Sequence, residues 1–513
     1  MNFPWLTVIG VLPLVGAAVC VLLPGDSRWL ARQLALAFSL LSFVGVVAVA
    51  VQFDLGAAGT AQFTEQHSWI APLGVSYALG VTGISLVMLL LAAALTPVCV
   101  LASWHVAGDD PAKVREFFAL ILAAESFILG VFMARDVFMF YMFFEAMLIP
   151  MYFLIGRFGG QQGKSASMKF LLFSLTGGLI MLAGVIAIGF SAVDPVTGGL
   201  APDAYLVDNL TGLTFSSVAA ERWMFLSFFI AFAIKAPMWP VHTWLPDAAA
   251  AAPPAVSVLL VGVLDKVGTY GMIVLCLPLF PEASQWAAPV IAALAVVSIV
   301  YGGLVAIAQR DLRRLIAFTS VSHFGFIILG IFAMTSTAQS GAVLYMLNHG
   351  FSTAALFGVC AMLMARFGTA RIGEYGGIQR VTPVLAGMFL LAGLSSLALP
   401  GMSSFISEFL VLAGTFARYP AAAVLATSGL VLSALYILLT YQRMATGPTR
   451  PGFDTAPDLS ARERWVLGPV IAVIIVLGFF PKPVLEMINP AVAETMTTVG
   501  VVDPAPVLEG ADQ

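Results

Sequence analysis

Apolar runs of about 20 residues recur along the whole chain and constrain its fold more than any other feature. An α-helix needs about 20 predominantly apolar residues to cross the hydrocarbon core of a bilayer. Only 10% of the residues are charged, whereas soluble domains have about 25%. The sequence therefore predicts an all-α polytopic membrane protein. We count fourteen runs, at about 4–24, 30–52, 79–105, 116–134, 136–156, 168–192, 223–248, 254–277, 286–308, 313–335, 341–365, 383–415, 421–442 and 465–482.

The distribution of lysine and arginine supports this count and orients the helices. When the N-terminus is placed outside, 17 of the 23 Lys and Arg residues fall in loops on the inner side and four fall outside. The other two, Lys235 and Lys266, lie within spans. Cytoplasmic loops of membrane proteins carry an excess of positive residues. We therefore expect a multi-pass protein of the cell inner (plasma) membrane, with both termini on the outer, periplasmic side.

Two of the apolar runs are interrupted by proline and also carry a charge. The segment "FAIKAPMWPVHTWLPD" (232–247) contains Lys235 and three prolines, and "LALPGMSSFISEFLVL" (397–412) contains Pro400 and Glu408. Proline removes a backbone donor and opens the helix, which is tolerated in a membrane where protein or water satisfies the freed groups. Two broken, charged helices in the two halves of a chain indicate an ion or solute pathway near the midplane.

The broken helices are the seventh and twelfth spans, and this offset of five predicts an internal repeat. A weaker sequence similarity relates the segment "ARDVFMFYMFFE", which begins at Ala134, to "QRDLRRLIAFTSVSH", which begins at Gln309. An odd offset turns the second unit upside down relative to the first. We expect helices 1–3 in residues 1–115, a five-helix repeat (helices 4–8) in 116–277, its inverted copy (helices 9–13) in 286–442, and the last loop, helix 14 and an outer tail in 443–513.

Six ionisable residues lie in six different spans at bilayer depth. A charge there costs about 2.5–3.5 kcal/mol on insertion scales, so such residues are usually functional. Protons pass between donor and acceptor groups and bound waters, and histidine titrates close to neutral pH. The series is therefore typical of a proton relay. Its members are Glu145, Lys235, Lys266, His323, His349 and Glu408.

Each of these residues also has a structural interpretation. Glu145 and Lys235 can form a fixed ion pair that only holds two helices together, instead of a pair that separates when a proton arrives. The two histidines can each bond to a backbone carbonyl, or together ligate a haem. Asp265 and Lys266 point about 100° apart on one helix, so they face different neighbours. A helix-end or interhelical role suits Asp265 as well as a transport role does.

The sequence has no pattern for a bound cofactor or metal ion. We find no phosphate-cradling glycine loop, no dinucleotide fingerprint and no cluster of metal ligands, and the four cysteines stand alone in apolar runs. No redox centre is therefore expected in this chain itself. Trp239, Trp244 and the scattered tyrosines are expected in the aromatic belts at the membrane interfaces.

With these residues quoted, the chain resembles the antiporter-like subunit M (chain 4) of proton-pumping NADH–quinone oxidoreductase, respiratory complex I. The resemblance covers nearly the whole chain and is densest at "FFEAMLIP", "AIKAPMWPVHTWLPDA", "DLRRLIAFTSVSHFGF", "NHGFSTAALF" and "LPGMSSFISEF". It implies a subunit of a proton-translocating enzyme that contains FMN, iron–sulfur clusters and quinone in other subunits. By motif, it assigns proton transfer to Glu145, Lys235, Lys266, His323, His349 and Glu408.

The resemblance also implies partners. These are L-type and N-type membrane-arm subunits, the lipid bilayer and ordered waters in the proton path, with no nucleic acid. Subunits L and N, and the large subunits of multisubunit sodium–proton antiporters, share the architecture but usually carry a lysine where this chain has Glu408. The chain also lacks the long lateral helix typical of subunit L. Both facts favour subunit M.

Three positions depart from the pattern of the family. Ala249 and Ala251 stand where the family commonly carries a histidine and a glutamate, and Asp265 replaces a usual apolar residue, which is similar to the actinobacterial branch. Three alternatives to a complex I subunit remain open at this point. They are the large subunit of a sodium–proton antiporter, a structural spacer whose charges only fix helices, and a lipid or solute flippase.

Overall fold

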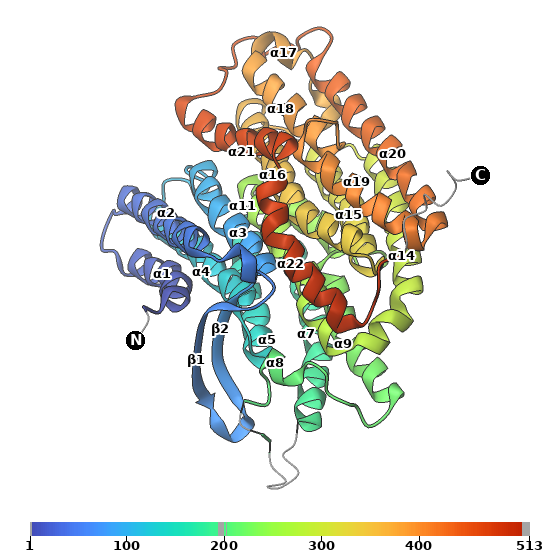
Figure 1. The fold of residues 1–513 in the computed structure, drawn as a ribbon. Coiled ribbons are helices and arrows are strands. Elements are labelled where there is room, and N and C mark those ends of the chain that lie inside the picture. The colour runs from blue at the N-terminus through green and yellow to red at the C-terminus, as the bar shows by residue number, and fades with distance from the viewer. Residues whose placement is uncertain (1–2, 193–199, 202, 505–513) are drawn as a thin grey trace, which may run out of the picture.

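The chain begins with four helices that pack beside a β-hairpin (Figure 1). The computed structural model describes residues 3–192, 200–201 and 203–504. Gly74 makes the turn before the second strand with a φ of 64°, a left-handed conformation that glycine adopts without strain. The elements are α1 (Trp5–Leu22), α2 (Arg28–Gln52), the antiparallel strands β1 (Gln62–Ile70) and β2 (Val75–Val81), α3 (Gly83–Ala102) and α4 (Pro111–Met133). The prediction of an all-α fold is thus wrong for this hairpin, which forms mostly within the loop predicted before the third apolar run and extends into the start of that run.

The rest of the described chain is helical. The next helices are α5 (Val137–Ala146), α6 (Leu148–Phe158), α7 (Gly163–Ser191), α8 (Val207–Leu210), α9 (Val218–Lys235), α10 (Trp244–Ala251), α11 (Pro254–Leu259), the π-helical turn η3 (Leu260–Leu264), α12 (Lys266–Gly271), the π-helical turn η4 (Met272–Cys276) and α13 (Leu277–Leu279). They are followed by α14 (Pro281–Ile307), α15 (Leu312–Phe332), α16 (Ser336–Phe367), α17 (Ile378–Val381), α18 (Pro383–Ser396), α19 (Ser403–Arg418), α20 (Pro420–Ala445), α21 (Ala461–Phe479) and α22 (Lys482–Val499). Short 3₁₀ turns lie at Leu55–Ala57, Ala71–Leu73 and Ile372–Glu374.

Each of the fourteen predicted apolar runs is occupied by helix. Among the described residues, eleven helices are long and apolar enough to cross a membrane, and the pair α21 and α22, bent by 70°, brings this number to at most twelve. The remaining two runs are the interrupted ones, α9 with α10 and α18 with α19. Fourteen spans, the inverted repeats and the division of the chain into 1–115, 116–277, 286–442 and 443–513 stay predictions.

The two predicted interruptions are present. No helix covers residues 236–243, between α9 and α10, or 397–402, between α18 and α19. The predicted outer tail is more ordered than expected, because α22 forms there and packs against α3 and α16 (Figure 1). Residues 505–513 of this tail lie outside the described residues.

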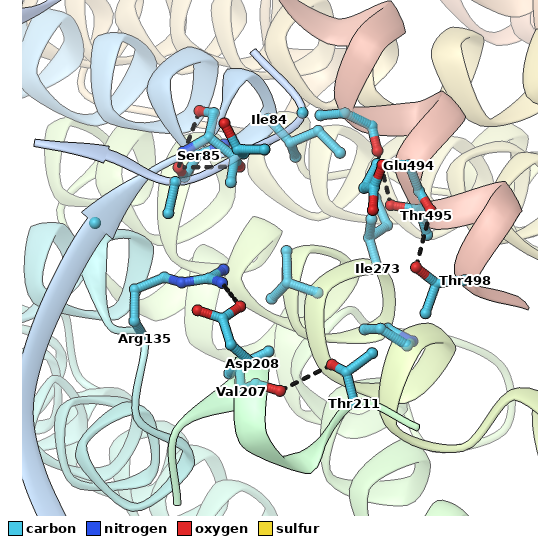
Figure 2. Close-up of a pocket in the computed structure, with 18 of the residues that line it drawn as sticks. Ile84, Ser85, Arg135, Val207, Asp208, Thr211, Ile273, Glu494, Thr495 and Thr498 are labelled. Atoms are coloured by element: carbon cyan, nitrogen blue, oxygen red, sulfur yellow. Dashed lines mark hydrogen bonds and ion pairs between the residues drawn. The ribbon is translucent and has the colours of Figure 1, made fainter. Parts of the chain in front are cut away.

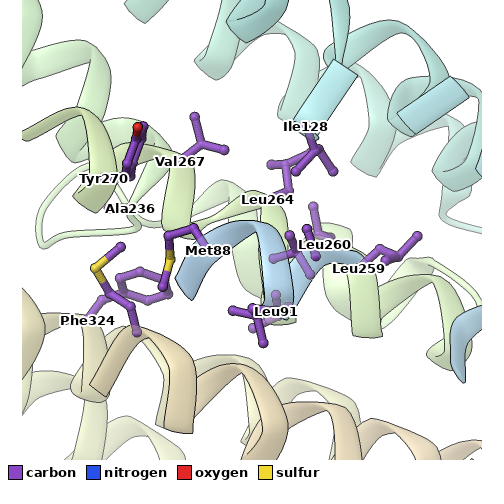
Figure 3. Close-up of a cluster of buried hydrophobic side chains, with 14 of the residues drawn as sticks. Met88, Leu91, Ile128, Ala236, Leu259, Leu260, Leu264, Val267, Tyr270 and Phe324 are labelled. Atoms are coloured by element: carbon purple, nitrogen blue, oxygen red, sulfur yellow. The ribbon is translucent and has the colours of Figure 1, made fainter. Parts of the chain in front are cut away.

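The core of the molecule lies where α12, α15 and α16 meet. α15 is buried along nearly its whole length, and α12 is buried throughout. Apolar side chains from α3, α4 and α15 surround the segment that joins η3 to α12, as Figure 3 shows for Met88, Leu91, Ile128 and Phe324. These four side chains are at most 1% exposed. Charged groups on α12 are therefore held in surroundings of low polarity, where charge–charge interactions are strong.

Candidate functional site

The end of α9 places Lys235 in the protein interior. Pro237 and Pro240 follow it and cannot donate backbone hydrogen bonds, so the helix does not continue. Part of the freed backbone is satisfied by protein, since Trp244 Nε1 donates to the Ile234 carbonyl at 2.8 Å. The broken helix is thus stabilised from within the protein, as a membrane segment requires.

The Lys235 ammonium lies beside two aromatic rings, one of which belongs to Phe144, the residue directly before Glu145. Lys235 is fully buried, and its Nζ lies 5.1 Å from the ring centroid of Phe144 and 5.4 Å from that of Phe170. These distances suit cation–π attraction. Glu145 is partly buried in α5, and its Oε1 lies against α7, where a Cβ on Gly178 would be only 1.7 Å away. No nitrogen–oxygen distance of 4.0 Å or less joins Glu145 and Lys235 in this structure.

Lys266 reaches toward α16 from the start of α12. It is fully buried, and its Nζ donates to the Val261 carbonyl at 2.5 Å and to His349 Nδ1 at 2.7 Å. The ring centroid of Phe324 lies 5.2 Å from the same nitrogen. Because a lysine ammonium has only donors, Nδ1 of His349 must accept this hydrogen bond while the lysine is charged. The sequence-predicted Lys266 and His349 are thus in direct contact.

The two histidines and Glu408 follow on from Lys266. The rings of His349 and His323 meet edge to face, with centroids 5.3 Å apart, which leaves no room for a haem between them. His323 Nε2 lies 3.3 Å from the Tyr436 hydroxyl, and its ring centroid lies 5.8 Å from that of Tyr345. Tyr345 donates its hydroxyl to Glu408 Oε1 at 2.8 Å. All five side chains are at most 3% exposed.

Polar side chains of α16 form hydrogen bonds with the two helices that flank the second break, α18 and α19. Asn348 Nδ2 donates to the Ser403 carbonyl at 2.6 Å and to the Ser407 hydroxyl at 3.2 Å. The Ser352 and Ser395 hydroxyls are 2.6 Å apart. These contacts hold the start of α19 and the end of α18 against α16, which carries His349, while Leu399 and Pro400 of the break itself are exposed.

Two residues of this cluster were missed by the sequence analysis. The prediction of interfacial belts is wrong for Tyr345, Tyr436 and Trp244, which are among the largest fully buried side chains. Their polar ends find partners inside the protein instead of at an interface. Tyr345 lies four residues before His349, one helical turn away, and this spacing was a usable signal. Nothing in the sequence pattern marks Tyr436.

Ion pairs of ordinary kind lie elsewhere in the fold. Asp247, in α10, accepts hydrogen bonds from Lys169 at 2.6 Å and from Arg314 at 2.7 Å, so it joins α10 to α7 and α15. Its side chain remains 35% exposed. Most direct ion pairs of the described residues are partly exposed, whereas Lys235 and Lys266 are fully buried and have no such pair there.

A cavity of about 510 Å³ brings the protein surface close to the buried lysine of α12. Its walls come from the hairpin side of α3, from α8 and from α22, and the ion pair of Arg135 with Asp208 lies across it (Figure 2). Tyr270 also lines this cavity and donates to the Phe132 carbonyl at 3.0 Å. Tyr270 follows Lys266 by four residues. The cavity therefore ends about one helical turn, roughly 6 Å, from the level of Lys266.

Residues 134–434 match the family model described as "NADH:quinone oxidoreductase/Mrp antiporter, TM". The chain is 48% identical to NADH-quinone oxidoreductase subunit M of Mycobacterium tuberculosis (strain ATCC 25618 / H37Rv), over 98% of this chain and 96% of that relative. The chain belongs to the subunit M family of NADH–quinone oxidoreductases. The resemblance seen in the sequence is thereby confirmed.

Solved structures agree with membership of the subunit M family. A chain of respiratory complex I from Thermus thermophilus with bound NADH superposes with a TM-score of 0.86 at 30% identity, covering 96% of this chain and 100% of that chain. The Mrp complex from Dietzia sp. DQ12-45-1b contains a chain with a TM-score of 0.82 at 23% identity, covering 97% of this chain and 100% of that chain. At that identity the Mrp match indicates a shared fold alone, so the sodium–proton antiporter alternative is the more distant one.

Proposed function

We propose that this subunit M family member translocates protons in the membrane arm of complex I, driven by quinone reduction elsewhere in the complex. Protons pass through Glu145, Lys235, Lys266, the histidine pair and Glu408. The observation that carries the proposal is the buried series of contacts from Lys266 through His349 and His323 to the two tyrosines and Glu408. Six neighbouring ionisable or hydroxyl side chains in a buried core are costly for a subunit that serves only as a structural spacer.

The contact between Lys266 and His349 supports the first transfer in this series. Their hydrogen bond of 2.7 Å has the lysine as donor, so a proton can move to Nδ1 and leave a neutral amine. The 5.3 Å between the ring centroids of His349 and His323 is too long for direct transfer, so a side-chain rotation or a bridging water completes that step. The hydroxyls of Tyr436 and Tyr345 then lie between His323 and Glu408.

The proposal includes a membrane orientation and partners. Both termini lie on the outer side of the cell inner membrane, which the positive residues of the loops support. L-type and N-type subunits flank the chain within the lipid bilayer, and the redox cofactors FMN and iron–sulfur clusters, with the quinone, belong to other subunits. Glu145 is partly exposed in the isolated chain, and a neighbouring subunit would cover it and strengthen its interaction with Lys235.

Removal of the Tyr345 hydroxyl tests the link between His323 and Glu408. We expect Tyr345→Phe to lower the protons pumped per NADH oxidised by intact complex I in proteoliposomes, because Glu408 loses its hydrogen-bond donor. Tyr375→Phe is the matched control, since Tyr375 bonds only to the Thr369 carbonyl of a loop. A normal pumping ratio in Tyr345→Phe, with assembly intact, would show that protons do not use this link.

A methyl group placed under Glu145 tests its position without removing its charge. In Gly178→Ala the new Cβ overlaps Glu145 Oε1, which must move away from α7, while the backbone is undisturbed. We expect assembly to be retained and the pumping ratio to fall. Gly184→Ala is the matched control on the same helix, because its Cβ meets the Ser227 hydroxyl and the Phe228 ring of α9 and does not approach Glu145. If both substitutions lower the pumping ratio equally, the loss comes from the packing of α7 and not from the position of Glu145.

A further inference from the structure

Asp265 is a buried carboxylate that has no role in the transfer steps described above. Its side chain is 0% exposed, and neither oxygen has a hydrogen-bond partner among the described residues. A buried carboxyl group without a hydrogen-bond partner either takes up a proton or is ionised beside a positive charge. Two fully buried ammonium groups lie nearby, because Lys266 is the next residue in the chain and Lys235 is on α9, against which α12 packs.

The packing of α12 turns Asp265 toward α9 and Lys266 toward α16. Gly268, three residues after Asp265 and on the same side of the helix, lies against α9. A Cβ on Gly268 would be 2.6 Å from the Phe232 carbonyl oxygen and 2.6 Å from the nitrogen of Ala236, the residue directly after Lys235. Lys266 instead contacts His349. Asp265 therefore faces the α9 end of the site, where Lys235 lies.

The π-helical turn η3 sets this orientation. The Asp265 amide donates to the Leu260 carbonyl at 3.2 Å, five residues back, in place of the four-residue spacing of an α-helix. The extra residue rotates everything after it by about 100° relative to a continuous α-helix. Such single π turns are frequent at functional sites. Without it, Asp265 and Lys266 would each face a different neighbour.

The charges of Glu145, Lys235, Asp265 and Lys266 balance when all four groups are ionised. Glu145 and Asp265 supply two negative charges, and Lys235 and Lys266 supply two positive charges. Phe144 and the apolar cluster of Figure 3 contribute no further charge. A net charge in such a core is strongly disfavoured, so one group can change its protonation state only if another compensates.

We propose that Asp265 is a second counter-ion of Lys235, which transfers the protonation state of Glu145 to Lys266. When Glu145 takes up a proton and becomes neutral, the Lys235 ammonium keeps its own proton and pairs with Asp265. The Asp265 carboxylate then stabilises the charge of Lys266 less, and Lys266 gives its proton to His349 Nδ1. One proton is gained by Glu145 and one leaves Lys266, so the four groups carry no net charge before or after. This inference rests on the proposed function.

The inference is tested in intact complex I reconstituted into proteoliposomes, with protons pumped per NADH oxidised as the readout. We expect Asp265→Asn and Asp265→Leu to assemble and to lower this ratio about twofold or more, which is the range for a weakened coupling between sites. Asp265→Glu should restore most of it. Thr269→Val, one turn along the same helix, is the matched control for packing.

Glu145→Gln, measured in parallel, separates the inference from the proposed function. If Glu145→Gln lowers the ratio and Asp265→Asn and Asp265→Leu do not, Asp265 has no part in coupling and the relay stands. If Glu145→Gln itself has no effect, the proposed function fails. If Asp265→Glu is as impaired as Asp265→Asn, Asp265 is only a packing residue. A redox-induced infrared difference spectrum provides a second readout, because a residue that serves only in packing would contribute no carboxylate bands to it. The bands lost in Asp265→Asn should reappear in Asp265→Glu.

Discussion

We expect Lys266→Met to abolish proton pumping by intact complex I while the complex still assembles. Lys266 is the donor to His349 and the only described ammonium group in contact with the histidine pair. Methionine matches the length of the lysine stem and is apolar, and Asp265 can take up a proton in the variant, so that no uncompensated charge is left in the core. The ratio of protons pumped to NADH oxidised should fall below about one tenth of its normal value. Loss of the donor raises the barrier of the transfer to His349, and each 1.4 kcal/mol added to a barrier slows a step about tenfold.

The control for Lys266→Met is Lys164→Met, which removes an exposed ammonium at the start of α7. NADH–quinone turnover of uncoupled vesicles reports whether the rest of the enzyme is intact. If Lys266→Met complexes pump at the normal ratio, Lys266 serves only to fix α12 against α16. The structural-spacer interpretation would then be favoured.

The second large effect is expected from Glu408→Gln. Glutamine retains an oxygen that can accept the Tyr345 hydroxyl, so the packing of α16 on α19 is preserved. It cannot take up and release a proton, so the series that begins at Lys266 loses its last group. We expect the pumping ratio to fall at least as far as in Tyr345→Phe, and to a similar extent at every pH, because no titratable group remains at this position.

Glu486→Gln is the control for Glu408→Gln, because Glu486 is exposed on α22 and pairs only with Lys482 at the surface. A second measurement distinguishes a relay from a structural role. The double variant Tyr345→Phe with Glu408→Gln should be no worse than Glu408→Gln alone, since both remove the same link. Additive losses would indicate that Tyr345 acts on something other than Glu408.

The helices of this fold could be predicted from the sequence because membrane physics leaves few choices. Runs of about 20 apolar residues must be helical where no water can satisfy the backbone. The prolines after Lys235 and at Pro400 marked the two breaks for the same reason. The hairpin at Gln62–Val81 was missed, because the short, mixed polar and apolar segment carries no comparable constraint and pairs mainly with itself.

The site was predicted only in part. A charge in an apolar run is conspicuous in a sequence, so Lys235, Lys266 and Glu408 were found. Tyrosine is expected both at interfaces and in cores, so Tyr345 and Tyr436 could not be assigned from composition. The fully buried Glu125 of α4 was also overlooked, although it too is a charge in an apolar run. The role proposed for Asp265 depends on a π turn, which no residue pattern in the sequence predicts.

The central claim is that protons move along one connected line of buried groups, and ordered water is its most direct test. An experimental structure of the intact complex, at a resolution that shows waters, should reveal waters that bridge Glu145, Lys235 and Asp265, and others between His349, His323 and Glu408. Continuous apolar packing between these groups, with no water within hydrogen-bonding distance, would contradict the account.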